Sequence, residues 1–145
     1  MGRVMRGRPL GTVVVLAVGL VAGAVWWTFF RGPSSQECAP VRELLSFNKT
    51  QVDAMNAKTE PSDLDYRSWA DGVRDRAQAV TEPDLAAAAE EVALTVDRLV
   101  RARADLDAQS KVIAPGAGPP PAAMVVTALN QQYQADVSRL AAACG

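Results

Sequence analysis

The segment from Leu10 to Phe30 places the strongest constraint on the fold, because it holds twenty-one consecutive residues without a charge. Arg8 and Arg31 bracket it. A helix rises about 1.5 Å per residue, so this segment would span about 31 Å, close to the roughly 30 Å of a bilayer's hydrocarbon core. The sequence therefore predicts a single transmembrane helix over residues 10–30, with the lipid bilayer as its partner.

The charges on either side of this segment predict its orientation. Residues 1–9 carry three arginines and no acid, whereas all sixteen acidic residues follow the segment, beginning with Glu37. Basic flanks stay on the cytoplasmic side, so we expect a short cytoplasmic tail over residues 1–9 and a plasma-membrane location. Residues 31–37 then form a juxtamembrane linker, and residues 38–145 form an extracytoplasmic domain. Beyond residue 31, eleven Lys or Arg face sixteen Asp or Glu. This net charge of −5 argues against nucleic acid as a partner.

A cleavable signal peptide is the alternative for the N-terminal segment. Ala22–Ala24 has the small-x-small spacing of a signal-peptidase site, and cleavage near Ala24 would secrete the remaining chain. However, the apolar run continues through Trp26, Trp27, Phe29 and Phe30. Aromatic residues at the end of a span are typical of the headgroup region, so we expect an uncleaved signal-anchor.

Gly19 and Gly23 form a GxxxG pattern inside the predicted span. This spacing lets two helix backbones approach closely, so a homodimer through this face is one hypothesis. The alternative is that small residues are simply common in membrane spans.

The chain has two cysteines, Cys38 and Cys144, near the two ends of the predicted exterior domain. Exterior compartments are oxidising, and a matched pair there indicates a disulfide. A zinc site is disfavoured because the chain contains no histidine and no third cysteine.

Apolar residues recur at intervals of three and four throughout the exterior domain, which predicts helices and no strand. We expect four helices, over residues 39–58, 62–80, 83–113 and 122–143. Residues 114–121 contain three consecutive prolines and two glycines, so they form a loop. The third helix carries a heptad-like seam: Leu85, Ala89, Val92, Val96, Leu99, Arg103 and Leu106.

Two similar segments precede the second and third helices, Thr59–Leu64 and Thr81–Leu85. Each offers a hydroxyl for an N-cap, a proline early in the helix, and carboxylates near the positive end of the helix dipole. Capping explains the similarity without a binding motif.

The disulfide also predicts the topology. In an antiparallel up-down four-helix bundle, the first helix starts and the fourth helix ends at the same end of the bundle. Three helices would place Cys38 and Cys144 at opposite ends, too far apart for a bond. The fold class is therefore all-α, with the disulfide end near the membrane and the loop at 114–121 pointing away from it.

Arg103 is out of place on an apolar seam, where an unpaired charge is costly. Three explanations are open: its stem is buried while its charge reaches water, it pairs with an acid such as Asp136, or it faces a partner. Tyr66 and Trp69 are the large aromatic residues of the second helix. Core packing is the simplest role for them, and a ligand pocket between helices is the alternative. Together, Tyr66, Trp69 and Arg103 are the candidate partner or ligand surface.

The composition argues against an enzyme. No histidine is present to serve as a base, and no nucleophile–base pair is apparent. Asp71 and Asp75 are i, i+4 neighbours that would suit a cation, but arginines alternate with them, as on a solvated helix face. We therefore predict no catalytic residue, no metal site and no cofactor.

Arginine outnumbers lysine twelve to three, and alanine is abundant. In composition and layout, though not in motif, the chain resembles small anchored envelope proteins of actinobacteria. Our leading hypothesis is a membrane-anchored helical interaction module that serves as an accessory or scaffold subunit for another envelope or membrane protein. The alternative is a binder or carrier of a lipid or other apolar ligand. A cavity beside Trp69 and Tyr66 would favour the carrier; a filled core with an apolar surface patch would favour the scaffold.

Overall fold

The computed structural model describes residues 32–145. The predicted span over residues 10–30, the cleavage site near Ala24, and Gly19 and Gly23 lie outside the described residues. Within the described part, no helix combines the length and the apolar character needed for a membrane crossing.

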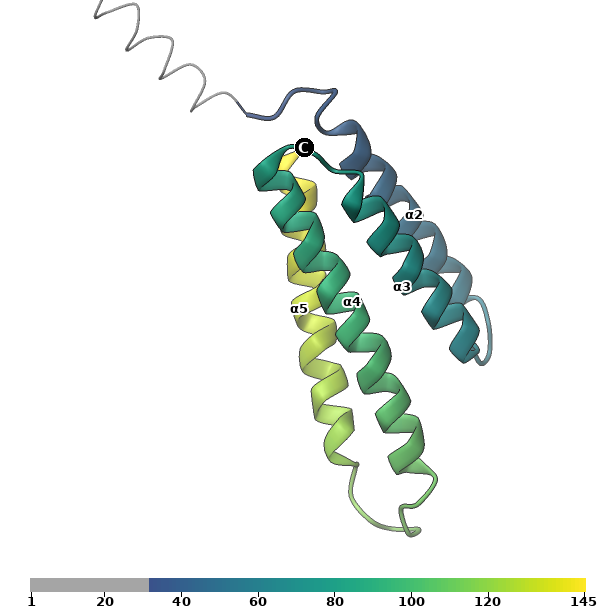
Figure 1. Cartoon of the computed structure of the whole chain (residues 1–145). Coiled ribbons are helices and arrows are strands. Elements are labelled where there is room, and N and C mark those ends of the chain that lie inside the picture. Colours follow the sequence, from purple (N-terminus) through teal and green to yellow (C-terminus); the bar gives the residue numbers. More distant parts are fainter. Residues whose placement is uncertain (1–31) are drawn as a thin grey trace, which may run out of the picture. The chain divides into compact units, whose positions relative to one another are not determined.

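Residues 33–145 form one compact unit of four helices joined by short turns and one long loop (Figure 1). The helices are α2 (Ala39–Asn56), α3 (Asp63–Gln78), α4 (Pro83–Ser110) and α5 (Pro121–Ala143). No strand occurs in residues 32–145. The four predicted helices are thus confirmed, with ends that differ by up to a turn. The largest difference is at α4, which ends at Ser110 rather than at residue 113.

Side chains cap the starts of α3 and α4, as predicted, but the positions of the caps and prolines differ in part from the prediction. Ser62 caps α3 in a capping box: its hydroxyl accepts from the Asp65 amide at 3.3 Å, and its own amide donates to the Asp65 carboxylate at 2.8 Å. Pro61 therefore precedes this helix instead of lying within it. At α4 the expected hydroxyl cap is wrong. The cap is Glu82, whose carboxylate accepts from the Leu85 amide at 2.7 Å, and Pro83 follows as the first helical residue.

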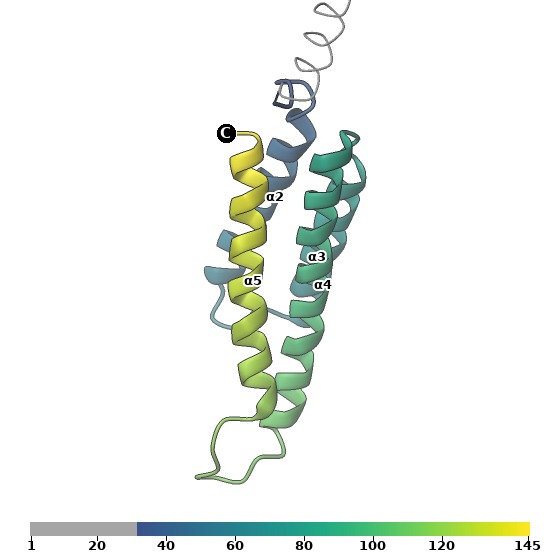
Figure 2. The same cartoon turned by 90° about the vertical axis from the view of Figure 1, so that its left-hand side faces the viewer.

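Cys38 and Cys144 form the predicted disulfide, with their Cα atoms 5.6 Å apart. It joins the residue before α2 to the residue after α5. Consecutive helices run in opposite directions, so the start of α2 and the end of α5 lie at the same end of the bundle (Figure 2). The four helices predicted from apolar spacing and the disulfide between Cys38 and Cys144 are thus satisfied by the same antiparallel bundle.

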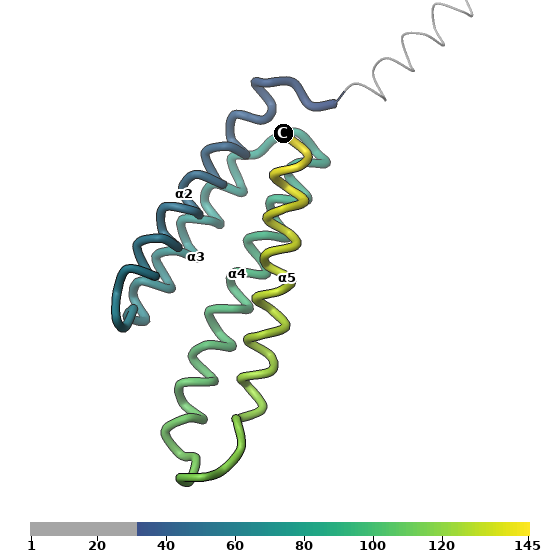
Figure 3. The backbone as a smooth tube through the Cα atoms, turned by 180° about the vertical axis from the view of Figure 1, so that it is seen from behind, coloured from purple at the N-terminus to yellow at the C-terminus, as the bar shows by residue number. Residues whose placement is uncertain are grey.

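The bundle consists of two hairpins, α2–α3 and α4–α5, that approach each other at the disulfide end and diverge toward the other end (Figure 3). α4 packs extensively on both α3 and α5, whereas α2 touches α5 only sparsely. α4 and α5 also extend beyond the turn between α2 and α3 (Figure 1).

The fully buried side chains lie in the half of the bundle nearer the disulfide. The largest of them are Leu44, Leu140, Val41, Val73, Val92, Val96 and Thr95. Along the seam of α4, the residues from Leu85 to Val96 are buried, but Leu99, Arg103 and Leu106 are only partly buried. The seam of α4 therefore stops being fully covered after Val96.

Candidate ligand cleft

A cleft of about 460 Å³ opens where the core ends, and all four helices contribute to its walls. Its volume falls within the range of small-molecule sites, about 300–1,000 Å³. The lining residues are Val52, Met55, Asn56, Pro61, Tyr66, Trp69, Leu99, Val100, Arg103, Val126, Thr127, Asn130, Tyr133 and Gln134. The sequence-predicted surface of Tyr66, Trp69 and Arg103 is thus brought together in one cavity.

The walls are mainly apolar and aromatic, with a few amide and hydroxyl groups on α2 and α5. Arg103 is the one charged residue among those that line the cleft. This combination of an apolar surface with few polar groups is typical of sites that bind apolar molecules in a defined orientation.

A buried polar network supports one wall of the cleft and joins three helices. The Trp69 indole N–H donates to Asn48 Oδ1 at 2.9 Å, and Asn48 Nδ2 donates to the Tyr133 hydroxyl at 2.6 Å. The Trp69 and Tyr133 rings also meet edge to face, with centroids 5.6 Å apart. Asn48 is 4 % exposed, so these bonds are shielded from water and hold both rings in place.

Tyr133 adds no charge to the cleft at neutral pH. Burial raises the pKa of its hydroxyl above 10.0, and the hydrogen bond from Asn48 opposes this rise only in part. The phenol therefore stays protonated, and Arg103 is the one charged side chain among the described residues that line the cleft.

Arg103 lies over the Tyr66 ring, with its guanidinium carbon 5.0 Å from the ring centroid, within the range of a cation–π contact. Its buried Nε has no hydrogen-bond partner. Within residues 32–145, no carboxylate forms an ion pair with it. The explanation that Arg103 pairs with Asp136 is therefore wrong.

Asp136 has different partners, which explains why it does not neutralise Arg103. Its carboxylate accepts from the Thr95 hydroxyl at 2.8 Å and lies 3.6 Å from Arg139. Both Thr95 and Asp136 are buried. Arg103 instead keeps part of its stem buried and presents its charge on the lining of the cleft.

A second, more open depression adjoins the cleft at Arg103. It is lined by the α2–α3 turn and the last turns of α4: Glu60, Pro61, Ser62, Asp63, Arg103, Asp107, Ser110 and Lys111. Three carboxylates therefore line the depression together with Arg103, and none of them forms an ion pair with it.

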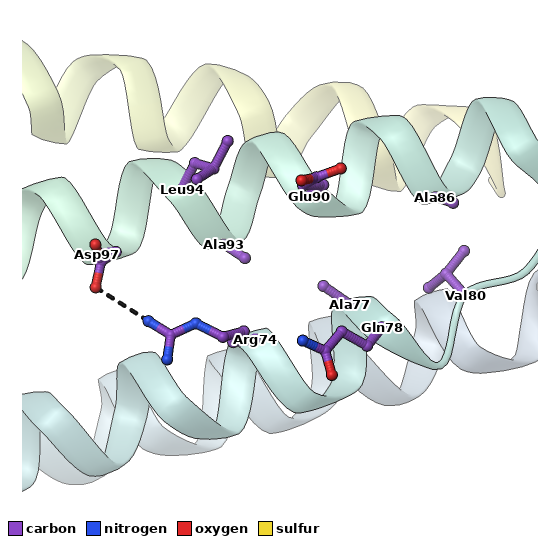
Figure 4. Close-up of a pocket in the computed structure, with 9 residues that line it drawn as sticks. All are labelled: Arg74, Ala77, Gln78, Val80, Ala86, Glu90, Ala93, Leu94 and Asp97. Carbon is purple, nitrogen blue, oxygen red and sulfur yellow. Dashed lines mark hydrogen bonds and ion pairs between the residues drawn. The ribbon is translucent and has the colours of Figure 1, made fainter.

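A separate groove of about 370 Å³ lies between α3 and α4 (Figure 4). The ion pair between Arg74 and Asp97, 3.1 Å apart, closes one end of it. Three alanines, Ala77, Ala86 and Ala93, are among its lining residues. No aromatic side chain is among its described lining residues, whereas three line the cleft.

Two acidic residues of α3 form ion pairs: Asp65 pairs with Lys58, and Asp71 pairs with Arg74. Arg74 contacts Asp71 at 3.2 Å as well as Asp97. Asp97 also pairs with Arg101. In the part of the chain that the structure describes, no group of three His, Cys, Asp or Glu residues is placed to hold a metal.

Sequence analysis missed two elements of the site. It did not single out Asn48 or Tyr133, although an amide at helical spacing from Leu44 and Val52 was a signal that a buried partner exists. It also missed Gly72, which lets α2 and α3 approach: a Cβ there would lie 2.2 Å from Phe47 Cζ.

In three comparisons with known proteins, no protein-family model, no curated protein and no solved structure matched the chain. The function must therefore be inferred from the cleft and its residues.

Proposed function

We propose that this chain is a membrane-anchored extracytoplasmic binding module whose cleft holds a small apolar ligand. The observation that carries the proposal is the cleft of about 460 Å³ beside Trp69 and Tyr66, to which all four helices contribute. A cavity at this place is the feature that separates a carrier from a scaffold with a filled core.

The shape of the bundle supports this role. The disulfide and the buried core stabilise one end of the bundle. Toward the other end the two hairpins diverge, so apolar side chains line the cleft instead of packing against one another. Leaving such surface open to water is costly, and an apolar ligand would cover it.

The experiment is to purify the full chain from its membrane in mild detergent, extract the protein with organic solvent, and identify the bound molecules by mass spectrometry. Val126→Phe adds a ring to the lining of the cleft and is expected to lower the amount of bound ligand at least several-fold. The matched control is Val125→Phe, since Val125 is half exposed and lies outside the cleft. Equal ligand in both variants would contradict the proposal.

The anchor is part of the same proposal and has its own test. If residues 10–30 span the bilayer, the full chain stays with membranes through an alkaline carbonate wash. Deleting residues 1–31 then releases a folded, soluble domain. N-terminal sequencing that found Val25 as the first residue of the mature protein would instead show cleavage.

The second candidate is the interaction module, an accessory or scaffold subunit of a cell-envelope assembly. Exposed apolar side chains near the tip of the α4–α5 hairpin favour it: Val112 is 82 % exposed and Met124 is 74 % exposed. Crosslinking in intact cells, followed by mass spectrometry, would test it. Met124→Ser is expected to lose a stoichiometric partner that Val126→Phe retains. A partner retained by both variants would argue against this surface.

A further inference from the structure

We infer that the cleft selects an apolar molecule with a single negative charge, a monocarboxylate, and that Arg103 binds its carboxylate. This inference rests on the proposed ligand role of the cleft and adds the chemical class of the ligand.

The first argument is the charge of the lining. Arg103 is the one charged residue among those that line the cleft, and within residues 32–145 no carboxylate neutralises it. A cation at an apolar surface is unfavourable unless an anion or a hydrogen-bond acceptor accompanies it. A carboxylate matches the planar guanidinium, which can donate two parallel hydrogen bonds to it.

The second argument comes from a comparison with Arg76, which has a similar environment. Arg76 also lies over an aromatic ring, with its guanidinium carbon 3.7 Å from the Phe47 centroid, and its Nε is also buried without a partner. However, its Nη1 donates to the Gly72 carbonyl at 3.1 Å, and it does not line the cleft. Arg103 has no hydrogen bond of this kind in the described part of the chain. Its guanidinium therefore remains available to a ligand.

The third argument limits the charge of the ligand to one. Glu60, Asp63 and Asp107 line the depression that shares Arg103 with the cleft. A second negative charge that reached this depression would meet like charges, which is unfavourable. Lys111 offsets this repulsion only in part. A phosphate monoester or another dianion is thus expected to bind more weakly than a carboxylate.

The apolar part of the ligand would lie against apolar lining residues such as Trp69, Leu99 and Val126, which come from α3, α4 and α5. A ligand with an acyl chain and a ligand with an aryl group would both suit such walls, and both would carry the carboxylate. The experiment therefore includes one probe of each kind.

Trp69 supplies the signal. The chain has three tryptophans, Trp26, Trp27 and Trp69. With Trp26→Phe and Trp27→Phe, the full chain in lipid nanodiscs reports only on Trp69, within the cleft. Titrations with decanoate, 4-phenylbutanoate, decanol and decyl phosphate are compared after correction with protein-free nanodiscs. We expect decanoate or 4-phenylbutanoate to bind, and the tighter of the two distinguishes an acyl from an aryl ligand. Decanoate is expected to bind more tightly than both decanol and decyl phosphate.

Arg103→Gln is expected to weaken carboxylate binding by about tenfold or more, the loss typical of a hydrogen bond to a charged group, and to leave decanol unchanged. The matched control, Arg76→Gln, should stay within about twofold of the parent chain. Arg103→Lys keeps the cation and should bind with intermediate affinity, which guards against a folding defect in the Gln variant. Circular dichroism checks that every variant is folded.

The outcomes distinguish a failure of the proposed ligand role from a failure of the inference about the carboxylate. If no probe binds, decanol included, the ligand role of the cleft is wrong. If decanol binds as tightly as decanoate and Arg103→Gln changes neither, the cleft binds apolar molecules but the inference about the carboxylate is overturned. Tighter binding of decyl phosphate than of decanoate would overturn the restriction to one charge.

Discussion

The indole N–H of Trp69 in α3 donates to Asn48 Oδ1 in α2 at 2.9 Å, behind the wall of the cleft. Because the same amide donates to Tyr133 in α5, one buried side chain fixes the positions of two aromatic rings on two other helices. The shape of the cleft therefore depends on a residue that does not itself line it.

Replacing Asn48 with alanine is expected to destabilise the domain by about 2–4 kcal/mol, because a buried donor and a buried hydroxyl each lose a partner. Urea denaturation of the chain with Trp26→Phe and Trp27→Phe, followed by Trp69 fluorescence, measures this loss. Asn130→Ala is the matched control, since Asn130 is an exposed helical amide. Equal effects of the two substitutions would show that the network does not stabilise the fold.

The buried pair of Thr95 and Asp136 should also be necessary for stability. Thr95→Val keeps the shape of the side chain but leaves the Asp136 carboxylate without its 2.8 Å donor, with an expected cost of about 1–3 kcal/mol. The double variant Thr95→Val with Asp136→Leu removes both polar groups. It should be no less stable than the single Thr95→Val variant. A double variant much less stable than the single one would contradict this account.

Gly72→Ala tests the close approach of α2 and α3. Alanine favours a helix over glycine by up to about 1 kcal/mol, but its Cβ would overlap the Phe47 ring. Displacing that ring also disturbs its contact with Arg76. We expect a net destabilisation of about 1–2 kcal/mol, in line with other overpacked sites. In a Phe47→Ala background the same substitution should be neutral or stabilising, and thermal denaturation of all four chains completes the cycle.

The disulfide should make a large contribution to stability, because α2 touches α5 only sparsely elsewhere. The bond links residues separated by 106 positions, and the chain-entropy model assigns such a loop about 4–5 kcal/mol. Adding a reductant should lower the urea midpoint accordingly. The double variant Cys38→Ala with Cys144→Ala should match the reduced chain and show no response to reductant; a residual response would point to another redox-sensitive contact.

The capping box at α3 predicts a pH dependence. The pKa of Asp65 is lowered to about 2, first by its contact with Lys58 at 2.6 Å and then by the amide and hydroxyl of Ser62. Since the pKa of an unfolded Asp is about 3.9, this stabilisation is complete above that value and is lost as the pH falls toward about 2. Asp65→Asn should therefore be less stable than the parent at pH 6, and the difference should shrink below pH 4. A constant difference in thermal midpoint across this range would contradict the assignment.

The sequence by itself determined the four helices, the disulfide and the antiparallel order. Apolar spacing along each segment is local information, and proline placement and the capping carboxylates limit where helices begin. The position of Cys38 and Cys144 then leaves few topologies, because the bond requires both ends at one side of the bundle.

Only the tertiary structure decided where the hairpins diverge, and thus that the seam of α4 stops being buried after Val96. The angle between hairpins depends on the sizes of side chains from all four helices packed together, which no single segment encodes. The packing of all four helices also decides which residues Arg103 and Asp136 contact. Arg103 meets Tyr66 from α3 rather than Asp136 from α5, and the cleft that contains it exists only where the four helices meet.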